Sequence, residues 1–238
     1  LFYANQQTEA VEHVSTLGEF ICSSVETKNT IRDALCENAH LIDSFVAENP
    51  LHFSAGELDV LRDWKHFIKG QFFVMRYLKK YTVFLEESQP RAYGVVGLSD
   101  EIEDMLGPRL PIYLETVLLP FRGQIVYDGL VTTYSVYFGP GMRRSLNDAY
   151  QEAKFRYGVI TSLPFSPDKA EISYADRLKF YLKSKGNRER YWEEIENLVN
   201  KDSSLLILYH QEMGKIDARA LKKRLREMRI KKAWFALL

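Results

Sequence analysis

The stretch from Leu110 to Leu130 constrains the fold more than any other part of the sequence, because it reads as two strands joined by a tight turn. Apolar residues occupy both faces of the first arm with the two-residue period of a largely covered β-strand. Pro120 cannot donate to a ladder and should lie at the strand end, and Gly123 can adopt the positive φ of a hairpin turn. The chain then returns over residues 124–127, and Asp128-Gly129 favours a second turn.

Shorter segments rich in aromatic and β-branched residues surround this hairpin and are suited to strands. They cover residues 72–77, 82–85, 93–98 and 134–138. Because the connections between them are short, we expect antiparallel neighbours in a strongly curved sheet.

Amphipathic helices are predicted on both sides of the sheet region. Apolar residues recur every three or four positions over residues 8–25 and 27–48, and Ser54 with Glu57 has the spacing of a capping box at the start of a third helix. A further helix over residues 139–157 carries an apolar stripe that would pack on the sheet. The sequence therefore predicts an α+β fold with N-terminal helices, a central antiparallel sheet or small open barrel with a packed helix, and a C-terminal helical segment.

Domain boundaries follow from changes in composition. We expect a helical head over residues 1–69, the sheet with its packed helix over 70–163, and a basic helical tail over 164–238. Pro164 and Pro167 suit a stiff linker before the tail. Residues 1–163 should form one structural unit.

Three sequence motifs carry a resemblance to other proteins. They are LPFRGQIVYDGL, RRSLNDAYQEAK and, upstream of both, GQFFVMRYLKKYTVFL. Over roughly residues 41–164 the chain resembles an uncharacterised bacterial family of conserved hypothetical proteins. The resemblance implies a bacterial intracellular protein, and it supplies no activity, ligand or catalytic residue.

Cysteine content and hydropathy bear on the compartment. The chain has only two cysteines in 238 residues, which favours a reducing environment over a disulfide framework. No apolar run approaches the ~20 residues that a membrane helix requires. The sequence therefore predicts a soluble cytoplasmic protein without a membrane partner.

Familiar catalytic and metal-binding motifs are absent from the sequence, including G-x-S-x-G, the P-loop, H-E-x-x-H and C-x-x-C. The five histidines are scattered singly. The acidic residues Asp100, Glu101, Glu103 and Asp104 invite a metal hypothesis, but carboxylates at a helix start are explained more simply by the helix dipole. No cofactor and no metal site are predicted.

The first candidate site is the junction before the helix over residues 139–157. Its members are Gly139, Gly141, Arg143 and Arg144. Unpaired N–H groups at a helix start, glycines that permit close approach and two arginines have the physics of an anion or phosphate site. The alternative is that Gly and Pro simply mark a common transition from loop to helix, and that the arginines pair with Glu115, Asp128 or Asp148.

The second candidate is Tyr127 with Asp128. As a site, the pair would offer a phenol and a carboxylate at the rim of the sheet, with Asp128 as a possible general base. As structure, Asp128 would bond its own backbone in a turn, and this interpretation is favoured because nothing in the sequence perturbs its pKa.

The third candidate is the basic tail. Charge is uneven along the chain, with 5 Lys and Arg against 11 Asp and Glu in residues 1–70, and 17 against 10 in residues 169–238. Within residues 219–232 eight cations face one acid, and Lys222, Lys223, Arg226 and Arg229 are the predicted contacts. Such a helix would bind an acidic protein surface or nucleic acid, or would pair with the acidic head, within one molecule or in an oligomer.

These observations lead to a functional hypothesis with one competitor. The hypothesis is a non-catalytic cytoplasmic binding or assembly protein that uses its basic C-terminal helix. The competitor is an enzyme acting on an anionic, phosphate-bearing substrate, with Arg143 and Arg144 as clamps and Asp128 as base. The competitor requires all three side chains to converge in one pocket.

Overall fold

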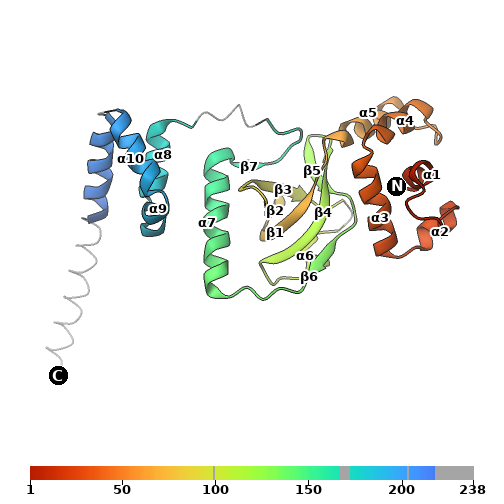
Figure 1. Ribbon diagram of the computed structural model, residues 1–238, viewed down its shortest axis with the longest axis horizontal. Helices are drawn as coiled ribbons and strands as arrows, with labels where there is room; N and C mark the ends of the chain where they lie inside the picture. Colours follow the sequence, from red (N-terminus) through yellow and green to blue (C-terminus); the bar gives the residue numbers. More distant parts are fainter. Residues whose placement is uncertain (99, 167–171, 203, 218–238) are drawn as a thin grey trace, which may run out of the picture. The chain divides into compact units, whose positions relative to one another are not determined.

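The structure is a computed structural model that describes residues 1–98, 100–166, 172–202 and 204–217 (Figure 1). The chain divides into two compact units, unit 1 over Leu1–Pro167 and unit 2 over Asp168–Leu238. Unit 1 contains a helical head and a seven-stranded sheet, while the described part of unit 2 is helical. The predicted α+β class is confirmed.

The head of unit 1 consists of short helices. They are α1 (Phe2–Thr8), α2 (Leu17–Cys22), α3 (Val25–Glu37), α4 (His40–Glu48), α5 (Ala55–Asp63) and the 3₁₀ turn η1 (Trp64–His66). Their common core is formed by Ala4, Val14, Ile31 and Leu41. The predicted capping box at Ser54 and Glu57 is present at the start of α5.

Two helices predicted in the head are shorter than expected. Residues 8–25 do not form one helix, because the Asn5 side chain bonds the backbone of Val11 and Val14 and holds a loop between α1 and α2. Residues 27–48 are divided at Asn38, whose amide donates to the Ala34 carbonyl. In both places an asparagine competes with the backbone for helical hydrogen bonds.

The sheet has seven strands. They are β1 (Ile68–Leu78), β2 (Tyr81–Glu86), β3 (Ala92–Val96), β4 (Ile112–Phe121), β5 (Gln124–Tyr127), β6 (Thr132–Tyr134) and β7 (Val159–Ile160). The β4–β5 hairpin forms as predicted, with Gly123 at φ 77°. Antiparallel ladders join β1 to β2 and β4, β2 to β3, and β4 to β5 and β6.

The prediction of an entirely antiparallel sheet is wrong, because β3 pairs in parallel with both β5 and β7. After β3 the chain passes through α6 (Ile102–Leu106) and β4 before it returns as β5. This crossover brings β5 back in the direction of β3. The sheet is therefore mixed.

The sheet is strongly curved. Strand β1 pairs with β2 on one edge and β4 on the other, so the order β1-β2-β3-β5-β4 returns to β1. The β3–β5 contact has only two residue pairs, and β1 has a register shift between Val74 and Arg76. The sheet is thus not a true barrel. Its concave side holds the main core, formed by Phe72, Val74, Phe84, Tyr93, Val95, Ile102, Leu114, Leu118, Ile125 and Ile160.

Helix α7 (Pro140–Tyr157) covers part of the outer side of the sheet, as the apolar stripe predicted (Figure 1). Its Leu146, Tyr150 and Ala153 pack with Val83 and Leu85 of β2. Gly158 ends the helix at φ 71°. The outer faces of β2 and β3 are thereby closed to solvent.

The described part of unit 2 contains α8 (Tyr174–Leu182), α9 (Lys185–Arg190) and α10 (Trp192–Lys201). Residues 204–217 are also helical. Ser173 caps α8 through the Asp176 amide. The core includes Leu178, Leu182, Ile195 and Leu198. No helix within the described ranges has the length and apolar character needed to cross a bilayer.

Candidate functional site

Asp128 lies in a buried polar cluster between the sheet and the head. Its Oδ1 accepts hydrogen bonds from the Leu130 amide at 3.1 Å and from the Thr116 hydroxyl at 3.3 Å. Its Oδ2 lies 3.7 Å from Nη1 of Arg32. The bond to Leu130 is the local turn bond of an Asx residue, so Asp128 has the structural role that the sequence favoured.

Arg32, which projects from α3, is the centre of this cluster. Only 3% of its side chain is exposed, and it also lies 3.6 Å from Glu115 and 3.4 Å from Asp33. Its Nη1 donates to the Leu130 carbonyl at 3.3 Å. A buried guanidinium shared by three carboxylates fixes α3 against the sheet.

The surroundings of Asp128 do not leave its carboxylate free to contact a substrate. Burial raises the pKa of Asp128, while the Leu130 amide and the Arg32 guanidinium oppose that rise. Both oxygens face protein groups, and only 11% of the side chain is exposed. The neighbouring Tyr127 hydroxyl lies 3.5 Å from the sulfur of Met105, so the phenol and the carboxylate have separate partners.

One of the two arginines at the junction before α7 binds backbone carbonyls of the protein itself. Arg143 donates from Nε to the Phe138 carbonyl at 2.9 Å and from Nη1 to the Leu110 carbonyl at 2.7 Å. Arg144 is exposed. A Cβ on Gly139 or Gly141 would meet nothing within 4 Å, so neither glycine is required by a close approach. These contacts give Arg143 a structural role, and the anion site at this helix start stays a prediction.

The structure does not bring Arg143, Arg144 and Asp128 together. Asp128 is held at Thr116 within β4, whereas Arg143 is held at Leu110, before β4 begins. Six residues of extended chain span roughly 20 Å. The one pocket formed by these three residues, which the hypothesis of a phosphate-binding enzyme required, is therefore not formed.

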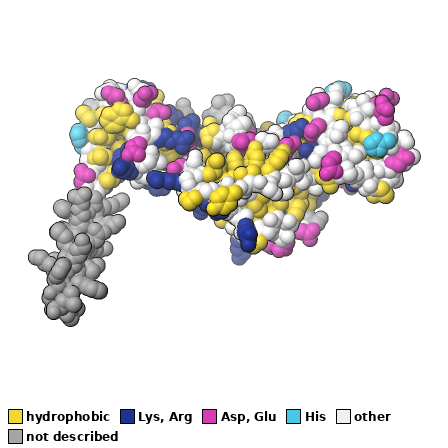
Figure 2. All heavy atoms as spheres, turned by 60° about the horizontal axis from the view of Figure 1, so that its bottom comes forward, with side chains coloured by type: hydrophobic (Ala, Val, Ile, Leu, Met, Phe, Trp, Pro, Cys, Tyr) yellow, Lys and Arg dark blue, Asp and Glu magenta, His cyan; other side chains and the backbone are white. Residues whose placement is uncertain are grey.

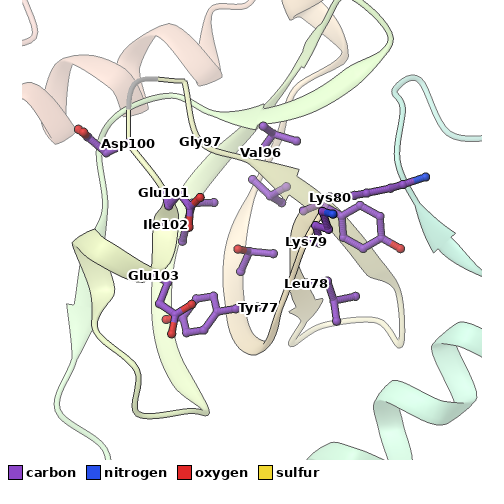
Figure 3. Close-up of a pocket in the computed structure, with 13 residues that line it drawn as sticks. Tyr77, Leu78, Lys79, Lys80, Val96, Gly97, Asp100, Glu101, Ile102 and Glu103 are labelled. Atoms are coloured by element: carbon purple, nitrogen blue, oxygen red, sulfur yellow. The ribbon is translucent and has the colours of Figure 1, made fainter.

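One open cavity of 480 Å³ lies between the β1–β2 hairpin and the β3–α6 connection (Figure 3). Lys79 and Lys80 come from the hairpin, and Asp100, Glu101 and Glu103 come from the opposite wall. Its volume is within the ~300–1,000 Å³ of small-molecule sites. All five of these charged side chains are exposed, and the described residues contain no group suited to hold a metal ion.

A row of aromatic residues on the outer side of the sheet was not found from the sequence. Phe73 of β1 lies opposite Tyr113 of β4, which lies opposite Tyr134 of β6. Their ring centroids are 4.8 Å and 5.1 Å apart. The sequence shows that each residue belongs to a strand, but the pairing register that aligns them is not local information.

The predicted contacts of the basic tail, Lys222, Lys223, Arg226 and Arg229, lie outside the described residues. The described part of unit 2 contains a second basic stretch, which sequence reasoning did not single out. Between residues 176 and 190, six of the eight charged residues are Lys or Arg. Among them Lys179, Lys183 and Lys185 are exposed on or beside α8 and α9.

Comparison with models of protein families, with curated proteins and with solved structures found no match.

Proposed function

We propose that the chain is a non-catalytic cytoplasmic binding or assembly protein whose basic C-terminal region contacts an acidic protein surface. The observation that carries this proposal is the concentration of exposed cations on α8 and α9, which precedes the eight cations of residues 219–232. Clustered charges of one sign raise the rate and specificity of association with a surface of opposite sign.

The cations of α8 and α9 are weakly engaged within the unit. Lys179 lies 3.6 Å from Asp176 and Lys185 lies 3.6 Å from Glu189, and more than half of each of these four side chains is exposed. Exposed pairs of this kind contribute only ~0–1 kcal/mol. Lys183 has no ion pair within the described part of the chain. All three lysines can therefore face a partner at little cost.

One feature favours an acidic protein over nucleic acid. In partly open five-stranded barrels of the OB type, the outer face of the second and third strands binds oligonucleotides. Helix α7 covers that face here, so β2 and β3 offer no stacking surface.

The test compares two probes on the full chain. Fluorescence anisotropy is measured with a labelled polyglutamate peptide and with a single-stranded oligonucleotide of equal charge. We expect tighter binding to polyglutamate, and an affinity that falls as salt is added. Equal or tighter binding to the oligonucleotide would assign the basic region to nucleic acid.

A matched pair of variants locates the contact. Lys179→Glu/Lys183→Glu/Lys185→Glu should weaken polyglutamate binding by roughly tenfold. Lys79→Glu/Lys80→Glu/Lys154→Glu makes the same charge change on exposed positions of unit 1 and should leave affinity within about twofold. If both triple variants lose affinity equally, net charge alone is responsible and the proposal fails.

A further inference from the structure

We propose that the outer face of β1, β4 and β6 is a binding site for an arginine or lysine side chain presented by an extended peptide. This aromatic face consists of the rings of Phe73, Tyr113 and Tyr134 together with the polar side chains of Gln71, Glu87 and Glu115. These residues belong to unit 1, whereas the basic stretch belongs to unit 2. The aromatic face would bind a positively charged partner, and the basic stretch a negatively charged one.

The rings form a continuous surface because the strand register aligns them. Phe73 and Tyr113 are stacked with an interplanar angle of 24°, and Tyr134 lies against Tyr113 at 36°. Phe138 covers the Phe73 end of the row in a T-shaped contact, so the ring at the exposed end is Tyr134. Aromatic rings carry negative charge on their faces. Cations bind such faces with about 0.5–1 kcal/mol at exposed sites.

Carboxylates border the rings and give the face its charge. The Tyr113 hydroxyl donates to Oε2 of Glu87 at 2.8 Å, and the Tyr134 hydroxyl donates to Oε2 of Glu115 at 3.0 Å. Oε1 of Glu115 is near Arg32, but Oε1 of Glu87 has no hydrogen bond or ion pair among the described residues. One carboxylate oxygen is therefore left to accept from a ligand.

The face lies between two covered regions of the sheet. On one side Tyr150 and Leu146 of α7 pack toward Phe73 and Tyr113, and on the other Asn29 of α3 donates to Thr132. Tyr134 remains 37% exposed, and Tyr137, just beyond β6, is 91% exposed. Figure 2 shows hydrophobic side chains gathered on the surface of unit 1 with acidic and basic side chains beside them. The uncovered part of the sheet is thus both aromatic and acidic.

The chemistry selects a cation. A phosphate or carboxylate ligand would be repelled by Glu87 and Glu115, and its charge would face the negative side of the aromatic quadrupole. A guanidinium can stack on a tyrosine ring and donate to a carboxylate at the same time, because it is planar and has five N–H donors. An arginine side chain therefore uses both features of the face.

The topology indicates how a peptide would lie there. Strand β6 is last in the strand order, pairs only with β4 among the described strands, and has exposed residues at Thr133 and Tyr134. The Tyr134 carbonyl accepts from the Val136 amide, so a peptide would bind the other main-chain groups of β6. An extended segment can add to such an edge through main-chain hydrogen bonds. Its alternate side chains would then point over the face that carries Tyr134.

The test uses the full chain, labelled with ¹⁵N, and an acetylated and amidated peptide of alternating threonine and arginine. The same peptide with citrulline in place of arginine keeps the shape and removes the charge. We expect saturable amide shifts at β6 and at Gly70 and Gln71 with arginine, and affinity lower by about fivefold or more with citrulline. Equal affinity for the two peptides, or no saturable shift at β6, would overturn the proposal.

Variants test whether the peptide binds the aromatic face specifically or responds to any exposed carboxylate of the protein. Glu87→Gln should weaken arginine-peptide binding about two- to fivefold, and Tyr134→Leu should weaken it at least as much, as loss of a salt bridge and of a cation–π contact respectively. Glu103→Gln removes a carboxylate that is also exposed, at the cavity, and serves as the control. Tyr113→Phe retains the ring and reports the hydroxyl alone. A control variant that loses as much affinity as Glu87→Gln would refute the assignment.

Discussion

Arg32 of helix α3 and Asp128 of the turn after β5 face each other across the junction of head and sheet, with Nη1 and Oδ2 3.7 Å apart. The Arg32 side chain is buried, with 3% exposed, and the Asp128 side chain is largely covered, with 11% exposed. The same guanidinium reaches the Leu130 carbonyl, so the turn, the sheet and the head are held by one residue. Asp128, which the sequence offered as a possible general base, therefore takes part in an internal contact of unit 1.

Removal of the Arg32 charge should be costly. Arg32→Leu leaves Asp128 and Glu115 without their buried cation, and we expect a loss of about 3–5 kcal/mol in the free energy of unfolding, measured by urea denaturation. Asp128→Asn alone should cost less. The double variant should cost less than the sum of the two single variants, because the uncompensated charge is removed together with its partner.

The Arg32 variant should also depend on pH. Burial raises the pKa of Asp128, so ionisation of its carboxyl disfavours the folded state, and the stability it contributes is lost as pH rises through that pKa. Without Arg32 the pKa should rise further. Arg32→Leu should therefore be closer to wild type at acidic than at neutral pH, and a defect that does not change with pH would count against this explanation.

Arg143 and Arg144 should differ in their effect on stability. Arg143→Ala removes the donor to two backbone carbonyls and should lower the free energy of unfolding by about 1–2 kcal/mol. Arg144→Ala changes an exposed side chain and should stay within about 0.5 kcal/mol of wild type. If thermal or urea unfolding shows the same loss of stability for both variants, the two backbone hydrogen bonds of Arg143 do not contribute as we expect.

Glu19 should make α2 sensitive to acid. Hydrogen bonds from the amides of Ser15 and Thr16 lower the pKa of Glu19 from 4.5 to about 2. A lowered carboxyl pKa stabilises the folded state above 4.5, and that contribution is lost as pH falls toward 2. Glu19→Gln should thus melt below wild type near neutral pH, and the difference should shrink on acidification. Glu12→Gln, an exposed change nearby, should show no such trend.

The two cysteines should react at different rates. Burial raises the pKa of Cys36 to about 11, whereas Cys22 is exposed on α2. Because the thiolate is the reactive form, an aromatic disulfide reagent at mildly alkaline pH should titrate one thiol quickly and one slowly. Cys22→Ser should abolish the fast phase, and urea should make Cys36 fast. A fast phase that survives in Cys22→Ser would contradict the burial of Cys36.

Local sequence patterns were sufficient to predict the features that depend on residues adjacent in the chain. Alternation and Gly123 predicted the β4–β5 hairpin, Ser54 with Glu57 predicted the start of α5, and a 3.6-residue stripe predicted α7 on the sheet. Each of these is decided by the covalent geometry and propensity of a few successive residues. The apolar period does not predict the break at Asn38, because this break depends on a side-chain hydrogen bond to the Ala34 carbonyl.

Other features were decided only by the tertiary structure. The parallel pairing of β3 with β5, the meeting of Arg32 with Asp128, and the row of Phe73, Tyr113 and Tyr134 each join residues that are distant in the sequence. The sequence by itself determined the elements, their turns and the uneven charge of the chain. Which strands pair, and in what register, depends on burial of the whole core, because shifting one strand by a single residue would turn every side chain to the opposite face.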